Sequence, residues 1–222
     1  FMLPNTPPKL ASNKKLSFRE IMGIDALSML KDKGFLFFFI ASILICVPLA
    51  FYYQHANQFL NELGMKAAAS KMILGQISEV LFLLLLPIFI KRYGIKNALI
   101  VGILAWGIRY ILFAYGNVGT QVWMLIFGII LHGVCYDFFF VSGQIYTDFK
   151  AGEKFKSTAQ GLITLATYGV GMLIGFRFAG WLTDQYITDS GHLWKNIWIQ
   201  PAIFSFVVLT LFLIFFKNET IK

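Results

Sequence analysis

Two carboxylates lie inside stretches of the sequence that are apolar enough to cross a membrane. Asp137 follows Tyr136 and precedes three consecutive phenylalanines, in an apolar stretch from residue 124 to about residue 145, and Glu79 lies in a second such stretch. An ionisable side chain at the centre of a bilayer costs roughly 2.5–3.5 kcal/mol on insertion scales. Such residues therefore tend to face a cavity or a partner, and they mark the paths of substrates and protons.

Gln76 and Glu79 form the first pair of polar side chains that could bind a ligand. They are three residues apart, so they share one face of a helix. A carboxamide beside a carboxylate can bind a ligand that both donates and accepts hydrogen bonds, such as a nucleobase or a ribose. The alternatives are that Glu79 forms a structural ion pair with Arg109 of the next helix, or that it lies at the membrane edge.

His132, Tyr136 and Asp137 form the second group. His132 and Tyr136 are four residues apart and share a helix face, whereas Asp137 is rotated by about 100° from Tyr136 and Gln144 returns to the side of Asp137. Burial disfavours the charged form of a carboxyl, so Asp137 could bind and release a proton near physiological pH, as coupling to a proton gradient requires. The alternative is an aspartate held by a hydroxyl or a lysine near the cytoplasmic end of the span.

Other residues within the apolar stretches have simpler explanations. Arg109 is expected to pair with a carboxylate, whereas Arg177 lies near the end of its span and could extend toward the headgroups. Gly171 and Gly175 form a GxxxG pair, which predicts close helix packing rather than glycines that line a permeation path. A polar and aromatic cluster in the first span fits either an aromatic membrane belt or the mouth of a ligand pocket. Its members are Tyr52, Tyr53, Gln54, His55, Asn57 and Gln58.

The composition is that of an integral membrane protein. Of the 222 residues 58% are hydrophobic, 17% are aromatic and only 14% are charged. The net charge of +8 comes from short basic clusters between apolar runs, a pattern of membrane topology that argues against a nucleic-acid partner. Cys46 and Cys135 both lie in apolar spans, which favours neither a disulfide framework nor a metal site. With no hydrolase, kinase or phosphate-loop motif in the sequence, we expect neither an enzyme nor a cofactor.

The hydropathy pattern predicts an all-α membrane protein with six transmembrane helices, since about 20 apolar residues cross a bilayer. The expected spans are 34–59, 67–90, 95–115, 121–147, 157–185 and 193–216. Residues 1–16 read as a linker and residues 17–33 as an amphipathic helix on the membrane surface, with Ser17 and Glu20 as a capping box. Residues 34–216 would form a six-helix bundle, followed by a tail over residues 217–222. The chain does not begin with Met, which suggests a fragment of a longer protein.

The distribution of basic residues predicts the orientation of the bundle. Most of the 19 lysines and arginines lie in the amino-terminal segment, in the loops after the second and fourth spans, and in the tail. The other side has only Lys66, Lys71 and Lys195. Because positive charge is retained on the cytoplasmic side, both ends of the chain are expected in the cytoplasm.

Several strings, spread in order over nearly the whole chain, resemble those of the bacterial nucleoside:proton symporter family, a branch of the major facilitator superfamily. The loop Arg92-Tyr93-Gly94-Ile95-Lys96-Asn97 resembles the cytoplasmic signature of that superfamily, although Lys91 stands where an acidic residue is usual. The other strings are Gly23-Ile24-Asp25-Ala26, Gln76-Ile77-Ser78-Glu79, Ala105-Trp106-Gly107-Ile108-Arg109, Leu112-Phe113-Ala114-Tyr115-Gly116, Asp137-Phe138-Phe139, Ser142-Gly143 and Ala159-Gln160-Gly161.

The resemblance implies roles for particular residues. In that family a Gln and a Glu of the second helix bind the nucleoside, which implies these roles for Gln76 and Glu79. A Tyr and a Phe of the fourth helix contact the ligand beside an aspartate implicated in proton coupling; the aspartate matches Asp137, whereas His132 and Tyr136 replace the two aromatic residues. The Gln and Asn that the family has on its first helix are replaced by Ala50 and Tyr53, so those roles are not transferred.

The sequence thus predicts the carboxyl-terminal half of a transporter of the cell inner membrane that takes up nucleosides with protons by alternating access. Its partners would be the nucleoside, the lipid bilayer and an amino-terminal six-helix half of the same polypeptide, and protons would be the coupling ion. Gln76, Glu79, His132 and Tyr136 would bind the substrate, and Asp137 or Glu79 would carry the proton. The alternatives are a different sugar-bearing cargo, or a membrane receptor or assembly protein that transports nothing.

Overall fold

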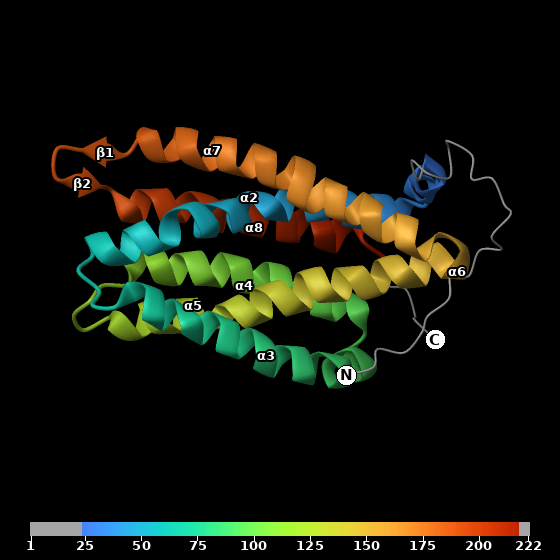
Figure 1. Cartoon of the computed structure of the whole chain (residues 1–222), viewed down its shortest axis with the longest axis horizontal. Coiled ribbons are helices and arrows are strands. Elements are labelled where there is room, and N and C mark those ends of the chain that lie inside the picture. Colours follow the sequence, from blue (N-terminus) through green and yellow to red (C-terminus); the bar gives the residue numbers. More distant parts are fainter. Residues whose placement is uncertain (1–23, 218–222) are drawn as a thin grey trace, which may run out of the picture.

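The computed structural model describes residues 24–217, and the side chains of all of these except residues 24, 25 and 153–155. The helices lie side by side in one elongated bundle (Figure 1). In chain order the elements are the 3₁₀-helix η1 (Ile24–Lys31), α2 (Lys33–Glu62), α3 (Ala68–Tyr93), α4 (Ile95–Tyr115), α5 (Val122–Tyr136), the π-helix η2 (Asp137–Val141), α6 (Ser142–Thr164), the π-helix η3 (Leu165–Gly171), α7 (Met172–Asp184), the strands β1 (Ile187–Thr188) and β2 (Gly191–His192), and α8 (Trp194–Phe215).

Six helical segments are long and apolar enough to cross a membrane, which confirms the predicted all-α membrane fold. They are Lys33–Glu62, Ala68–Tyr93, Ile95–Tyr115, Val122–Gly152, Lys156–Asp184 and Trp194–Phe215. The largest difference from the expected spans is the end of the fourth, which continues from residue 147 to Gly152, where a positive φ of 60° breaks the helix. Of the predicted surface helix, η1 is the described part; residues 17–23 and the tail from residue 218 lie outside the described residues.

The fourth and fifth spans each contain a π-helix, η2 and η3, which the sequence did not predict. A π-helix makes i→i+5 hydrogen bonds and therefore has more residues per turn than an α-helix. Spacing across η2 consequently does not follow the α-helical period. The prediction that Gln144 returns to the side of Asp137 relied on that period; in the structure Asp137 is buried and Gln144 is exposed.

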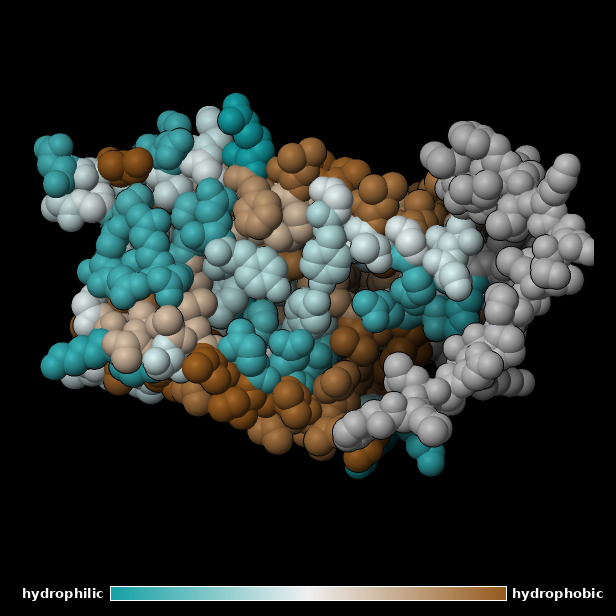
Figure 2. Space-filling view, in the orientation of Figure 1, coloured by the Kyte–Doolittle hydropathy of each residue, from teal (hydrophilic) through white to brown (hydrophobic). Residues whose placement is uncertain are grey.

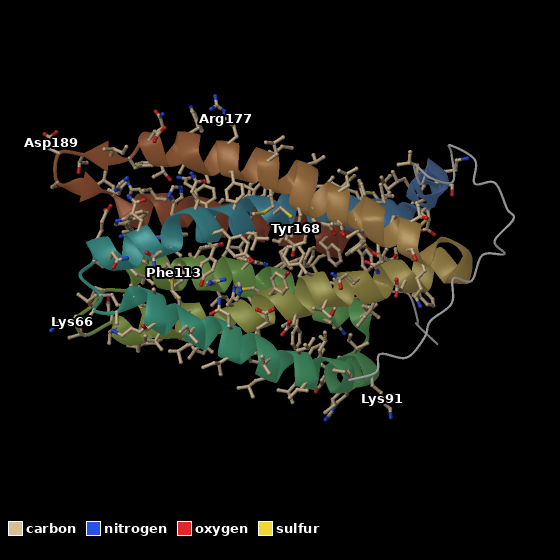
Figure 3. All side chains as sticks on the ribbon, in the orientation of Figure 1. Lys66, Lys91, Phe113, Tyr168, Arg177 and Asp189 are labelled. Carbon is tan, nitrogen blue, oxygen red and sulfur yellow. The ribbon has the colours of Figure 1, made fainter. Side chains whose placement is uncertain are left out.

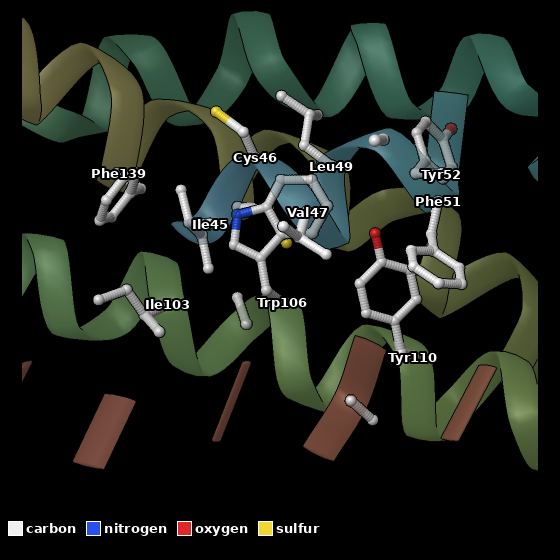
Figure 4. Close-up of a cluster of buried hydrophobic side chains, with 14 of the residues drawn as sticks. Ile45, Cys46, Val47, Leu49, Phe51, Tyr52, Ile103, Trp106, Tyr110 and Phe139 are labelled. Atoms are coloured by element: carbon white, nitrogen blue, oxygen red, sulfur yellow. The ribbon is translucent and has the colours of Figure 1, made fainter. Parts of the chain in front are cut away.

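Aromatic side chains fill the centre of the bundle, where α4 packs against α5 and α8. The Tyr110 ring stacks on Trp198 with centroids 5.4 Å apart and an interplanar angle of 7°. The Tyr110 hydroxyl donates a hydrogen bond to the Pro48 carbonyl of α2, so this ring also ties α4 to α2. Figure 4 shows Tyr110 and Trp106 of α4 beside the aliphatic side chains of α2. The core thus holds α2, α4 and α8 together.

Glycine residues of η3 and α7 allow the fifth span to pack tightly on α2. A Cβ atom on Gly171 would lie 2.8 Å from the Cβ of Cys46, and one on Gly175 would lie 2.7 Å from the Cβ of Ala50. Larger side chains at these two positions would push the helices apart, so the predicted packing role of the GxxxG pair is confirmed.

The outer surface separates apolar edges from a polar face. Along α3 the side chains of Leu81, Leu84 and Ile88 are more than half exposed, as expected of a helix that faces lipid or another apolar partner. Figure 2 shows hydrophilic and intermediate residues in the middle of one face, with hydrophobic residues along α3 below and along α7 above. Lys66 and Lys91 lie at opposite ends of the bundle, and Arg177 points away from it (Figure 3).

Candidate functional site

A close contact between α3 and α5 brings Glu79 beside His132. The Ser78 hydroxyl accepts a hydrogen bond of 3.1 Å from the backbone N–H of Gly133 and donates one of 2.6 Å to the Gly75 carbonyl. A Cβ on Gly133 would lie 2.5 Å from the carbonyl carbon of Ser78, so only glycine allows this approach. As a result, Glu79 Oε2 lies 3.7 Å from His132 Nε2. Small residues on both helices therefore determine the position of the carboxylate.

We expect Gly133→Ala to destabilise the protein by about 1–3 kcal/mol, because the new methyl group would overlap the backbone of α3. Thermal unfolding of the purified protein in detergent measures the effect. Gly161→Ala is the matched control, since no atom lies within 4 Å of the position of its Cβ. Equal stability of the two variants would contradict the account of the contact between α3 and α5.

Arg109 is fully buried behind His132. The sequence predicted that Arg109 pairs with a carboxylate, and among the described residues it does not. Its Nη1 lies 3.0 Å from His132 Nδ1, and its Cζ lies 3.5 Å from the centre of the Tyr52 ring. The Tyr52 ring in turn stacks on His132, with centroids 5.2 Å apart. Among the described residues, no carboxylate forms an ion pair with Arg109, so a direct pair between Glu79 and Arg109 is not formed: His132 stands between them.

Together these four residues form what we call the central polar cluster: Tyr52, Glu79, Arg109 and His132. It combines a cation, a carboxylate and an imidazole within the span of the membrane. Arg109 and His132 are almost completely buried, whereas the Glu79 side chain keeps 34% of its exposure. The cluster therefore reaches from the core to the surface, and Glu79 is its accessible end.

Asp137 is the first residue of η2 and is only 1% exposed. Its Oδ2 has no hydrogen-bond partner among the described residues. The alternative interpretation required a hydroxyl or a lysine as partner, and in the described part of the chain neither holds this oxygen. The following residues of η2 pack tightly on α4, where a Cβ on Gly102 would lie 2.7 Å from the backbone nitrogen of Phe139. A carboxyl oxygen buried without a partner is costly, which favours a functional role for Asp137 over a purely structural one.

Tyr136 and Tyr168 add an aromatic pair to the same region. The Tyr136 hydroxyl is hydrogen-bonded to that of Tyr168, which belongs to η3 of the following span and is 43% exposed. Tyr136 also lies beside His132, with ring centroids 5.9 Å apart. Sequence reasoning missed Tyr168, because a single tyrosine in a glycine-rich apolar stretch carries no sign of the neighbours that the fold gives it.

The remaining predicted residues are more dispersed. Gln76 is exposed one turn before Glu79 on α3. Tyr53 is 50% exposed, whereas Ala50 is buried against Gly175 of α7. Tyr53 is thus accessible to a ligand and Ala50 is not. His55, in the polar cluster of the first span, is a buried packing residue whose Nε2 lies 3.1 Å from the Thr183 hydroxyl.

The sequence matches the family model described as "Nucleoside H+ symporter" over residues 1–221. It is 43% identical over 227 residues to the putative nucleoside transporter YegT of Escherichia coli K12, a match that covers 99% of this chain and 53% of YegT. Nucleoside permease NupG of the same organism is 31% identical over 99% of this chain and 55% of its own length. The chain thus spans about half the length of the curated relatives it matches.

The fold also matches two crystal structures of the nucleoside transporter NupG. A mutant of NupG aligns with a TM-score of 0.86 at 30% sequence identity, over 93% of this chain and 54% of NupG. A second NupG structure aligns with a TM-score of 0.80 at 31% identity, over the same shares of both chains. The six spans are therefore arranged as in about half of that transporter.

Proposed function

Because the chain belongs to the nucleoside H⁺ symporter family, we propose that it is one half of a transporter that moves nucleosides across a membrane together with protons. The family consists of multi-pass membrane transporters rather than enzymes, in agreement with the six apolar spans. Since the chain covers 53% of YegT and 55% of NupG, the transport activity is proposed for the complete protein.

The observation that carries this proposal is the position of the central polar cluster. Its carboxylate lies within a membrane span and is partly exposed at the surface of the bundle, where apolar side chains would be expected of a purely structural helix bundle. Glu79 and His132 would hydrogen-bond the ribose or base, and Gln76 would add a carboxamide to the same helix face. Tyr136 would stack on the base, since aromatic rings stack on nucleobases irrespective of sequence.

The two carboxyl groups would bind and release the coupled protons. Asp137 is buried beside the substrate residues and Glu79 is accessible, so a proton on either group would change the charge next to the ligand. A change in charge at the site is what links proton binding to substrate affinity in a symporter. We therefore assign proton coupling to Asp137 or Glu79.

An amino-terminal six-helix half of the same polypeptide would pack against the polar face of this bundle. Both ends of this segment would be cytoplasmic in the inner membrane, because Lys91 and Lys66 lie at opposite ends of the bundle and basic residues concentrate on the side of Lys91. The substrate would bind near the midplane between the two halves, as in transporters that work by alternating access.

The replacement of two family residues by Ala50 and Tyr53 is the reason for a second candidate cargo, another sugar-bearing metabolite. A Xanthosine permease of E. coli is 28% identical to the chain, and xanthosine is itself a nucleoside, so this relative favours a nucleoside over the second candidate. Competition of unlabelled compounds against nucleoside uptake separates the two candidates. A receptor or assembly protein would instead bind ligand or partner without flux and would tolerate replacement of Asp137.

We expect cells that lack their own nucleoside transporters to accumulate labelled uridine or adenosine when they express the complete reading frame. A protonophore should abolish this accumulation, because it removes the gradient that drives symport. Accumulation that is insensitive to the protonophore would contradict proton coupling. Absence of uptake by protein shown to be folded and in the membrane would favour another cargo, with Tyr53 and His132 as the first residues to vary.

A further inference from the structure

We propose that Arg109 is a positioning residue of the substrate site, which holds His132 as a neutral imidazole that donates its only N–H proton toward Glu79. This inference rests on the proposed transport function, since it concerns how the same site presents its polar atoms to a nucleoside. It adds a role for a residue that lies too deep in the bundle to reach a ligand on the polar face.

The hydrogen-bonding chemistry of the two side chains determines the position of the proton. A guanidinium group can only donate hydrogen bonds, so the His132 Nδ1 that lies 3.0 Å from Arg109 Nη1 must be the acceptor. A neutral imidazole carries a single proton, which must then be on Nε2. A second proton would have to bind Nδ1, so the ring remains neutral as long as the hydrogen bond with Arg109 is formed.

The surroundings of Arg109 leave it little freedom to release His132. The guanidinium Cζ lies 3.5 Å from the centre of the Tyr52 ring, and the rings of Trp106 and Phe113 are each 5.5 Å away. Cation–π contacts with several rings stabilise a buried cation in one place. Tyr52 also stacks on the His132 ring, so the same aromatic side chain fixes both members of the hydrogen bond.

The other side of His132 faces the groups that could contact a substrate. Glu79 of α3 is the carboxylate next to Nε2, at 3.7 Å, and Tyr136 of α5 lies beside the ring. Tyr52 and Arg109 complete the titratable or charged groups that contact the imidazole. None of these groups accepts a hydrogen bond from Nδ1. None therefore favours the charged imidazolium over the neutral ring.

This arrangement places a hydrogen-bond donor and an acceptor side by side at the accessible end of the central polar cluster. His132 Nε2–H can donate to a substrate oxygen, and the Glu79 carboxylate can accept from the same group. A hydroxyl group is the simplest chemistry that satisfies both, because it accepts one hydrogen bond and donates another. The ribose hydroxyls of a nucleoside fit this pair, and a neutral His132 leaves the coupling proton to the carboxyl groups.

Nitrogen NMR of the complete protein tests the position of the proton without any transport measurement. Histidine labelled with ¹⁵N at both ring nitrogens would be incorporated, and the His132 signals would be assigned by their loss in His132→Gln. We expect a protonated Nε2 and an unprotonated Nδ1 that do not titrate between about pH 5 and 8, where an ordinary histidine changes its charge. A protonated Nδ1 or a charged ring in the wild-type protein would overturn the proposal.

The variant Arg109→Met removes the donor to Nδ1. We expect its His132 to populate both tautomers or to titrate in the same pH range, and the half-saturating nucleoside concentration to rise about tenfold, as for the loss of about 1.4 kcal/mol. Arg177→Met is the matched control, because Arg177 is exposed on α7 and points away from the bundle.

A second variant separates positioning from stability. Arg109→Lys keeps a donor and a positive charge, so it should retain the Nε2–H tautomer and recover part of the affinity that Arg109→Met loses. Unchanged His132 signals in Arg109→Met, or recovery of neither tautomer nor affinity in folded Arg109→Lys, would contradict the assignment. Because the tautomer is read without substrate, this result stands apart from any failure of the proposed nucleoside transport.

Discussion

Replacement of Glu79 by glutamine is expected to weaken the binding of nucleosides and to abolish their accumulation. Glutamine has nearly the same shape, but it carries no charge and cannot take up a proton. Hydrogen bonds to a charged group contribute about 1.5–3 kcal/mol, so substrate affinity should fall by about tenfold to a hundredfold. Equilibrium binding to purified protein and uptake by cells measure the two effects separately.

Glu62→Gln is a matched control for this substitution. Glu62 is the last residue of α2, where its carboxylate accepts hydrogen bonds from Trp194 Nε1 at 2.8 Å and from His192 Nδ1 at 2.9 Å. It is therefore a partly exposed glutamate outside the central polar cluster. Accumulation should be retained in Glu62→Gln. Normal uptake by Glu79→Gln would show that the accessible carboxylate has no part in transport.

Replacement of Asp137 by asparagine is expected to separate substrate movement from its driving force. The Asp137 carboxyl is buried, with Oδ2 unpartnered among the described residues, so its protonation state rather than a structural hydrogen bond is what asparagine removes. Gradient-driven accumulation should fall to the level reached by passive equilibration. Exchange of labelled for unlabelled nucleoside across the membrane, which needs no net proton movement, should stay within about tenfold of the wild-type rate.

Asp189→Asn provides the comparison, since Asp189 lies in the exposed turn between β1 and β2 (Figure 3). It should accumulate nucleoside normally. Loss of exchange as well as accumulation in Asp137→Asn, with protein still in the membrane, would place Asp137 in substrate binding instead. Unchanged accumulation in both Asp137→Asn and Glu79→Gln would rule out both carboxyl groups as the coupling site.

The six spans could be predicted from the sequence because their signal is local. Each is a run of about 20 or more apolar residues, and hydropathy requires no knowledge of the neighbouring helices. The two π-helices could not be predicted in this way. Within Asp137–Val141 every residue after the aspartate is apolar, and the tight contact of Phe139 with Gly102 of α4 belongs to the tertiary packing.

The candidate site was predicted in part for the same reason. Glu79 and Asp137 stand out because charge is rare in apolar stretches, and the helix period relates His132 to Tyr136. The predicted partner of Arg109 was wrong. A buried cation was expected to pair with a carboxylate, but the sequence does not say which helices face each other. The structure shows that His132 and Tyr52 fill that place.

The two π-helices also have a consequence for the evolution of this chain and its relatives. Each can be regarded as an α-helix that has received one additional residue, absorbed by a wider turn instead of a loop. The wider turn takes up the rotation of about 100° that an added residue would cause in an unbroken α-helix, so the later side chains keep the orientation of a helix one residue shorter. Loss of a single codon near Phe139 or Gly169 could therefore turn the π-helix into an α-helix and leave the direction of the later side chains unchanged.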